Sequence, residues 1–111
     1  MLGQLPSMRL RFQTAARVEL AEAYRRYEDD YPGRGIRFRN SVEALLERVI
    51  EAPLSLPRWS TRTQVRSAVV PGFPFKVIFG VEGELVVVYA VAHDKRRPGY
   101  WRNRKPIRPG S

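Results

Sequence analysis

The chain has 111 residues, of which 20 are Lys or Arg and 11 are Asp or Glu, and its formal net charge at pH 7 is +9. This length predicts one domain with a modest core. The lack of cysteine excludes disulfides, thiolate nucleophiles and cysteine-based metal sites, and no stretch approaches the roughly 18 apolar residues of a membrane-spanning helix, so no membrane partner is expected.

Residues 1–7 lack the basic start and the long apolar run of a signal peptide. We interpret them as a disordered leader and expect a cytoplasmic protein. The next stretch alternates Met8, Leu10 and Phe12 with Arg9 and Arg11. Such alternation predicts a strand over 8–12 that is buried on one face.

Two amphipathic helices follow this strand. The apolar stripe of the first is formed by Ala16, Leu20, Ala23, Tyr24, Tyr27 and Tyr31. Pro32 and two glycines in the segment 31–35 end it, since proline disfavours helix in the residue before it and glycine permits positive φ. The second helix places Phe38, Val42, Leu45, Leu46 and Val49 on one face and ends at Pro53. The pair predicts a helical hairpin.

The second half of the chain predicts a connector and three strands. Residues 53–64 contain two prolines and several Ser, Thr and Arg residues, which is typical of an irregular segment. Strand-like runs cover 65–70, 75–81 and 85–92, and a Glu-Gly-Glu turn joins the last two. The predicted fold is α+β: strand, helix, helix, strand, strand, strand, with the helical hairpin packed on one face of a mainly antiparallel four-stranded sheet.

The positive charge is concentrated at the C-terminal end. Residues 93–111 contain seven Lys or Arg and one acidic residue, so six of the net +9 charges fall there. The first 92 residues contain thirteen basic and ten acidic side chains, which is a nearly balanced surface. A polyanion or an acidic protein is therefore the expected partner of this end.

Several segments together resemble the RelE/ParE superfamily of bacterial type II toxins. They are the order of elements, the segment 31–35, the strand that contains Arg66, Phe-Pro-Phe at 73–75, and the run AVAHDKRRPGYW at 90–101. The resemblance covers a single domain at about residues 8–104. Residues 105–111 contain prolines and basic residues with little apolar surface to bury, so we expect a flexible basic tail there. The resemblance implies a toxin that inhibits growth until a cognate antitoxin neutralises it with an acidic or amphipathic segment.

Members of this superfamily differ in their target. RelE-like toxins cut mRNA in the ribosome, whereas ParE-like toxins inhibit DNA gyrase. The Phe-Pro-Phe segment and the Ala-His-basic-Pro-Gly-Tyr-Trp pattern look closer to the ParE-like or plasmid-stabilisation branch, which favours gyrase. A RelE-like endoribonuclease and a non-toxic antitoxin-binding module are the alternatives, and the sequence leaves open whether the protein is an enzyme.

A nuclease would need a general base, a general acid and positive charge beside the reacting phosphate. His93 is the only histidine, and histidine is the residue type best suited to proton transfer near neutral pH, so it is the first candidate. Arg66 matches the basic residue that RelE-like nucleases place after the helices, and Tyr100 completes the set. Alternatively, His93 is a structural hydrogen-bonding group, and Arg66 forms a cross-strand ion pair with Glu82 or Glu84.

Five further residues are candidates for binding a target or a nucleic acid. They are Arg96, Arg97, Trp101, Arg102 and Arg104. The arginines could pair with phosphate or with an acidic partner, and Trp101 could stack on a base. Alternatively, Tyr100 and Trp101 fold back over the open face of the sheet, because aromatic side chains bury large areas. No metal or cofactor is implied, since one histidine leaves only scattered carboxylates as ligands.

Overall fold

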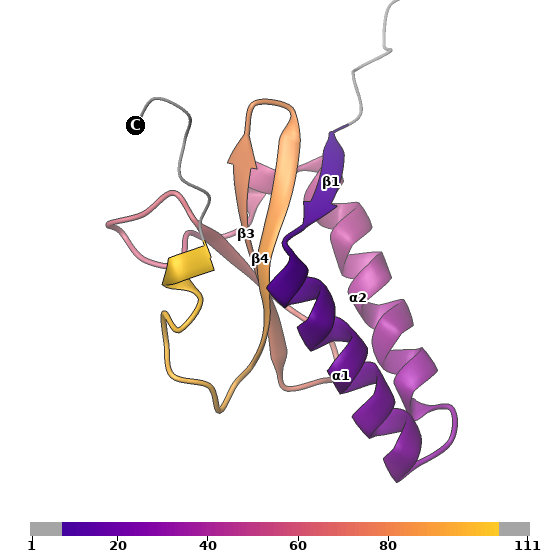
Figure 1. Cartoon of the computed structure of the whole chain (residues 1–111). Coiled ribbons are helices and arrows are strands. Elements are labelled where there is room, and N and C mark those ends of the chain that lie inside the picture. Colours follow the sequence, from indigo (N-terminus) through magenta and orange to yellow (C-terminus); the bar gives the residue numbers. More distant parts are fainter. Residues whose placement is uncertain (1–7, 105–111) are drawn as a thin grey trace, which may run out of the picture.

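The computed structural model describes residues 8–104, so the predicted leader 1–7 and tail 105–111 lie outside the described residues. The elements are β1 (Arg9–Phe12), α1 (Thr14–Asp30), α2 (Arg34–Glu51), β2 (Arg66–Val69), β3 (Phe75–Glu82) and β4 (Leu85–His93), with short 3-10 turns at Pro53–Ser55 and Arg102–Arg104 (Figure 1). This order is the predicted one. No helix of the described chain has the length and apolarity that crossing a membrane requires.

The four strands form one mixed sheet in the order β1-β4-β3-β2. The β2–β3 and β3–β4 pairs are antiparallel, which confirms the mainly antiparallel sheet. β1 lies parallel to β4, with Arg9 opposite Leu85 and Phe12 opposite Val88. The parallel pair depends on a long connection, which the two helices and β2–β3 supply.

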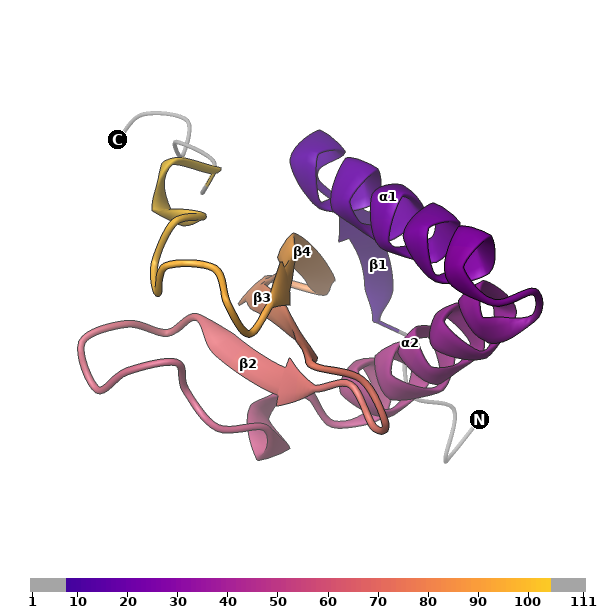
Figure 2. The ribbon, with the colours of Figure 1, turned by 90° about the horizontal axis from the view of Figure 1, so that it is seen from below.

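The helical hairpin covers one face of the sheet, and the connector after α2 and the C-terminal segment cover the opposite face (Figure 2). On the helical side, Phe38, Val42 and Val49 of α2 are fully buried with Val77 and Phe79 of β3. This interface holds the larger of the two clusters of buried residues, so it is the main core. Burial of each such side chain contributes about 1.5–3 kcal/mol.

Tyr31 is an exception to the predicted stripe of the first helix. It is 63% exposed, so the expectation that it belongs to the core is wrong. The physical reason is that α1 ends at Asp30 and Tyr31 caps it in an extended conformation, with φ −158°. Its side chain therefore leaves the helical stripe that Ala16, Leu20 and Tyr27 follow.

A carboxylate from α1 closes the turn between the helices. The Glu28 carboxylate accepts hydrogen bonds from the backbone N–H groups of Gly33 (2.8 Å) and Gly35 (3.0 Å) at the start of α2. Gly33 has φ +92°, which glycine adopts without strain. A negative charge at a helix N-terminus is also favourable electrostatically, so Glu28 stabilises the hairpin in two ways.

The second face of the sheet has its own apolar cluster. It consists of Val65, Ile78, Val87, Tyr89, Ala90 and Trp101. Trp101 is 3% exposed, and its ring packs edge-on against Trp59 of the connector with centroids 5.1 Å apart. Trp101 thus folds back over the open face of the sheet, as the structural interpretation of this residue predicted.

β4 changes register near its middle, where Phe79 pairs with Val88 but Ile78 pairs with Ala90. The pairing therefore skips Tyr89, which is the pattern of a β-bulge. The bulge lies at the point where β1 ends, because Phe12 is opposite Val88. The rest of β4 extends beyond β1 and runs beside α1, and it is there that the candidate site forms.

Candidate functional site

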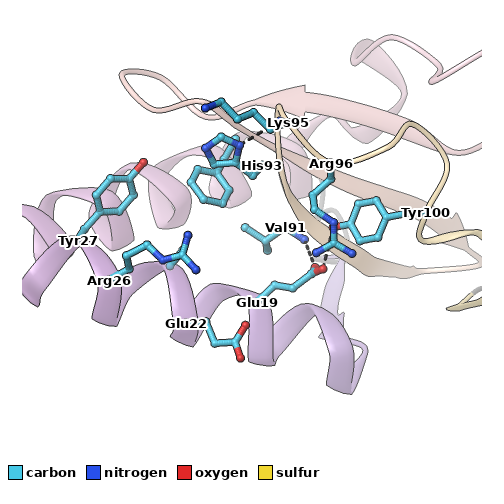
Figure 3. Close-up of a pocket in the computed structure, with 11 residues that line it drawn as sticks. Glu19, Glu22, Arg26, Tyr27, Val91, His93, Lys95, Arg96 and Tyr100 are labelled. Carbon is cyan, nitrogen blue, oxygen red and sulfur yellow. Dashed lines mark hydrogen bonds between the residues drawn. The ribbon is translucent and has the colours of Figure 1, made fainter. Parts of the chain in front are cut away.

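A cavity of about 460 Å³ lies between α1, the end of β4 and the segment that follows β4 (Figure 3). Its apolar lining consists of Ala23, Tyr27, Phe75 and Val91, and its polar lining of Glu19, Glu22, Arg26, His93, Lys95, Arg96 and Tyr100. We call it the α1–β4 cavity. It brings together three of the predicted site residues, namely His93, Arg96 and Tyr100.

Glu19 is the central acceptor beside this cavity. One carboxylate oxygen accepts the backbone N–H of Val91 (3.0 Å) and pairs with the Arg104 guanidinium (2.9 Å), and the other accepts the Tyr100 hydroxyl (2.7 Å). The Glu19 side chain is only 13% exposed, so this bonding offsets the cost of burying its charge. The carboxylate thus fixes β4 and the C-terminal segment to α1.

Tyr100 is held as a neutral phenol. Burial, the hydrogen bond to Glu19 and the Glu19 charge raise the pKa of Tyr100 to about 12, although Arg104 and Arg96 act in the opposite direction. The guanidinium carbons of Arg96 and Arg104 lie 3.9 and 4.9 Å from the centre of its ring, at cation–π distance. At neutral pH this side chain donates a hydrogen bond and does not act as a base.

His93 ends β4 and faces the cavity. Its Nδ1 accepts the backbone N–H of Lys95 (3.0 Å), so in the neutral ring the proton is on Nε2. The ring packs edge-on against Phe75, with centroids 5.0 Å apart. The hydrogen bond shapes the turn after β4, which is the structural role considered for this residue, while the ring also lines the cavity.

Arg66 lies away from the other two nuclease candidates. It is opposite Phe79 on β3, whereas His93 is opposite Phe75, so the two are separated by about 13 Å along the strands at roughly 3.3 Å per residue. The Arg66 guanidinium donates to the carbonyl oxygen of Leu56 (2.6 Å) and holds the connector. The alternative of a cross-strand ion pair with Glu82 or Glu84 is wrong, because Phe79 is opposite Arg66 and none of the ion pairs of the described residues includes Arg66.

The four remaining binding candidates lie along the C-terminal segment in different environments. Arg97 is exposed and lines a smaller hollow of about 150 Å³ on the other side of that segment. The guanidinium carbon of Arg102 lies 5.2 Å from the centre of the Trp59 ring, and Arg104 forms an ion pair with Glu19. Trp101 is 3% exposed and offers little surface to a partner. Arg96, Arg97 and Arg102 are thus the exposed cations of the predicted set, whereas Arg104 is partly buried.

Sequence reasoning missed Glu19 and Arg26. A signal for Glu19 exists, because it is three residues after Ala16 and four before Ala23, and so lies on the apolar stripe of α1. A carboxylate on such a stripe needs buried donors. Arg26 carries no comparable signal, since it is one of two adjacent arginines on an exposed part of the helix.

The side chains that line the cavity do not form a cluster of metal ligands. Between residues 8 and 104, no group of three or more His, Cys, Asp or Glu side chains is placed to hold a metal ion. The polar groups there are the cations Arg26, Lys95 and Arg96, the carboxylates Glu19 and Glu22, a neutral phenol and one histidine, and Glu19 is already paired with Arg104. Such groups bind anions and carboxylates.

Comparison with known proteins gave a match at the level of structure only. No protein-family model matches the sequence, and no curated protein matches it significantly. A solved structure described as a chromosomal ParDE TA system from P. aeruginosa is similar, with a TM-score of 0.69 and 18% sequence identity over 78% of this chain and 96% of that one. The chain therefore has the RelE/ParE-like fold that its sequence motifs predicted.

Proposed function

We propose that this protein is the toxin of a type II toxin–antitoxin system, and that it inhibits growth by binding DNA gyrase until a cognate antitoxin neutralises it. The fold supports the first part, because the similar solved structure is described as a ParDE TA system. The basic C-terminal segment, with Arg96 and Arg97 exposed, supports a binding role for that end of the molecule. We accordingly expect the protein in the cytoplasm, together with its proposed target.

The observation that favours inhibition by binding over RNA cleavage is that Arg66 lies apart from His93 and that the Tyr100 hydroxyl is already engaged. Arg66 lies on β2 at a register position remote from His93, and it is engaged with the Leu56 carbonyl. The Tyr100 hydroxyl is engaged with Glu19, and its pKa is raised to about 12. A general base, a general acid and a phosphate clamp must act on one phosphate, and Arg66 does not join His93 and Tyr100 at the α1–β4 cavity.

A RelE-like endoribonuclease is the second candidate, because His93 and Arg96 border the same cavity. An imidazole and a guanidinium are suitable groups for cleaving RNA at a phosphate. This alternative predicts that replacing His93 abolishes toxicity. The binding mechanism predicts that a His93→Gln variant stays toxic, since glutamine retains an acceptor for the Lys95 amide.

The experiment is expression of the chain in a growing bacterial culture, followed by two assays on the purified protein. Plasmid supercoiling by gyrase and integrity of mRNA on translating ribosomes are measured side by side. Inhibited supercoiling with intact mRNA supports the proposal, and cleaved mRNA with active gyrase replaces it with the nuclease. Unimpaired growth on expression would instead remove the toxin function and favour the alternative of a non-toxic antitoxin-binding module.

A further inference from the structure

Charge is divided unevenly between the segments that cover the two faces of the sheet. α1 and α2, on one face, contain seven basic and eight acidic residues. The connector 53–64 and residues 94–104, which we call the C-terminal segment, lie on the opposite face (Figure 2). These two segments contain seven basic residues and one acid, Asp94. The side of the molecule away from the helices therefore attracts polyanions.

Most of this positive charge is available to a partner. Arg104 is partly buried and paired with Glu19, but the other six cations are exposed, and none of the six forms an ion pair within residues 8–104. These six cations are Arg58, Arg62, Lys95, Arg96, Arg97 and Arg102. Five of them are arginines, whose planar guanidinium groups pair with phosphate through two parallel hydrogen bonds.

Two tryptophans hold the connector and the C-terminal segment side by side. The Trp59 and Trp101 rings pack edge-on, and the guanidinium carbon of Arg102 lies 5.2 Å from the centre of the Trp59 ring. The Trp59 N–H also donates to the Val65 carbonyl (2.7 Å), which closes a loop that carries the exposed Arg62. Cations from two distant parts of the sequence thus belong to one surface.

A hollow of about 150 Å³ on this surface is suited to one small anionic group. Lys76, Arg96 and Arg97 line it, and Asp94 is the one acid in the lining. Asp94 pairs with Lys76 at 3.8 Å, with both side chains about half exposed, and such pairs contribute at most about 1 kcal/mol. The hollow is smaller than whole ligand sites of about 300–1,000 Å³, so it admits one phosphate group of a longer partner.

The scarcity of exposed apolar side chains favours a nucleic acid over an acidic protein. Protein interfaces depend on a core of apolar and aromatic side chains that is depleted of charge. Among the described residues, no large hydrophobic side chain of the C-terminal segment is exposed, and Leu54 is the one exposed in the connector. Interfaces with DNA are more polar and more positively charged, as this surface is.

The aromatic rings favour a duplex over a single strand. Single-stranded nucleic acids bind by stacking their bases on accessible rings. Trp101 is 3% exposed, the Trp59 ring is in contact with Trp101 and Arg102, and the Tyr100 ring is in contact with two guanidinium groups. The groups that remain for binding are cations, which contact phosphates and carry no sequence information.

We propose that the connector and the C-terminal segment together bind the phosphate backbone of duplex DNA without reading its sequence. Arg96 and Arg97 pair with one phosphate at the hollow, and Arg62 and Arg102 contact others. This inference rests on the proposed function, since gyrase acts on duplex DNA, and it adds the DNA itself to the partners of the toxin.

The test is fluorescence anisotropy of a fluorescein-labelled 20-bp duplex DNA with the full-length protein, at several salt concentrations. Four phosphate contacts predict an affinity that falls by about 100-fold between 50 and 200 mM salt. Arg97→Gln and Arg62→Gln, one in each segment, should each weaken binding by about 3–10-fold and lower the salt slope by about 1. Arg25→Gln is the matched control, because it removes the same charge from an exposed position of α1, and its affinity should stay within about twofold.

Equal weakening by Arg25→Gln and Arg97→Gln would overturn the proposal, because it would show attraction by net charge without a defined surface. Tighter binding of a 20-nucleotide oligothymidylate, or of a 20-bp duplex RNA, would overturn the choice of duplex DNA. Polyglutamate that competes as well as the duplex at equal charge would reassign the surface to an acidic protein.

Supercoiling by gyrase is measured separately with the same proteins, so the two proposals fail in different ways. Duplex binding that depends on Arg97, without inhibition of supercoiling, supports the DNA-binding surface and removes gyrase as the target. Inhibited supercoiling by a protein that does not bind the duplex removes the DNA contact and leaves the proposed function intact.

Discussion

The hydroxyl of Tyr100 donates a 2.7 Å hydrogen bond to the carboxylate of Glu19, across 81 residues of sequence. The same carboxylate accepts the Val91 N–H, on the part of β4 that extends beyond β1. Glu19 therefore gives the edge of β4 an acceptor where the neighbouring strand has ended. One side chain of α1 thus fixes the sheet edge, the Tyr100 ring and Arg104.

Replacement of Glu19 with glutamine tests this relationship. The amide oxygen can still accept one or two of the hydrogen bonds, but the charged pair with the partly buried Arg104 is lost. We expect Glu19→Gln to lower the free energy of unfolding by about 1–3 kcal/mol, the range for hydrogen bonds to buried charged groups. Urea unfolding followed by circular dichroism measures this difference.

Glu22→Gln is the control for that measurement, because Glu22 is an exposed residue of the same helix, three positions further on. Its free energy of unfolding should stay within about 0.5 kcal/mol of the original value, as is usual for surface changes. Equal stabilities of the two variants would mean that the Glu19 network adds nothing to the fold.

The raised pKa of Tyr100 predicts a loss of stability in alkaline solution. The phenol ionises near its ordinary value of 10.0 when the chain is unfolded, but at about 12 in the folded protein. The folded state therefore favours the protonated form, and the resulting stability is complete below pH 10.0 and is lost as pH rises toward about 12. A Tyr100→Phe variant cannot ionise there.

Chemical unfolding at several alkaline pH values measures this effect. Between pH 10.0 and about 12 the unfolding free energy of the unaltered protein should fall more steeply than that of Tyr100→Phe. Equal slopes for the two proteins would show that Tyr100 has the same pKa in the folded and unfolded states. Comparing slopes removes the contribution of groups that titrate in both proteins.

The fold was largely predictable from sequence because its elements repeat clear periods. Phe38, Val42 and Val49 recur at helical spacing, and all three are fully buried in α2. The parallel pairing of β1 with β4 could not be read from such patterns, since a period of two gives the buried face and not the partner strand. Tyr31 also shows what spacing alone cannot predict. It stands at helical spacing from Tyr27, but α1 ends at Asp30, so Tyr31 lies outside the helix.

The candidate site was predictable only in part. His93, Arg96 and Tyr100 were found because reactive and charged side chains cluster after the last strand. Arg66 was grouped with them by family resemblance, and the β2–β3 register places it elsewhere. The apolar stripe of α1 marks Glu19 as a carboxylate that needs buried donors, but its partners depend on a bulge and on the end of β1, two tertiary features that no local pattern contains.

Replacement of Trp101 tests whether this residue stabilises the fold or belongs to a binding surface at the C-terminal end. Because it is 3% exposed and packs on Trp59, we expect Trp101→Ala to destabilise the protein by about 3–5 kcal/mol, as for other buried aromatic residues. Arg97→Ala, an exposed neighbour, should leave stability unchanged within about 0.5 kcal/mol. Thermal unfolding measures both, and a stable Trp101→Ala variant would contradict the structural role and return Trp101 to the binding surface.

Gly35 tests how closely the two helices must approach. A Cβ atom at this position would lie 2.5 Å from the carbonyl oxygen of Tyr24 and 2.9 Å from a Glu28 carboxylate oxygen. The backbone of α1 cannot yield as a flexible side chain would, so Gly35→Ala should force the hairpin apart and cost about 1–3 kcal/mol, the usual range for overpacking. Asn40→Ala, at an exposed position of α2, makes an alanine in the same helix without this clash, so its stability should not fall. If urea unfolding shows that Gly35→Ala gains stability as Asn40→Ala does, the helix propensity of alanine outweighs the contact and the hairpin is looser than its geometry indicates.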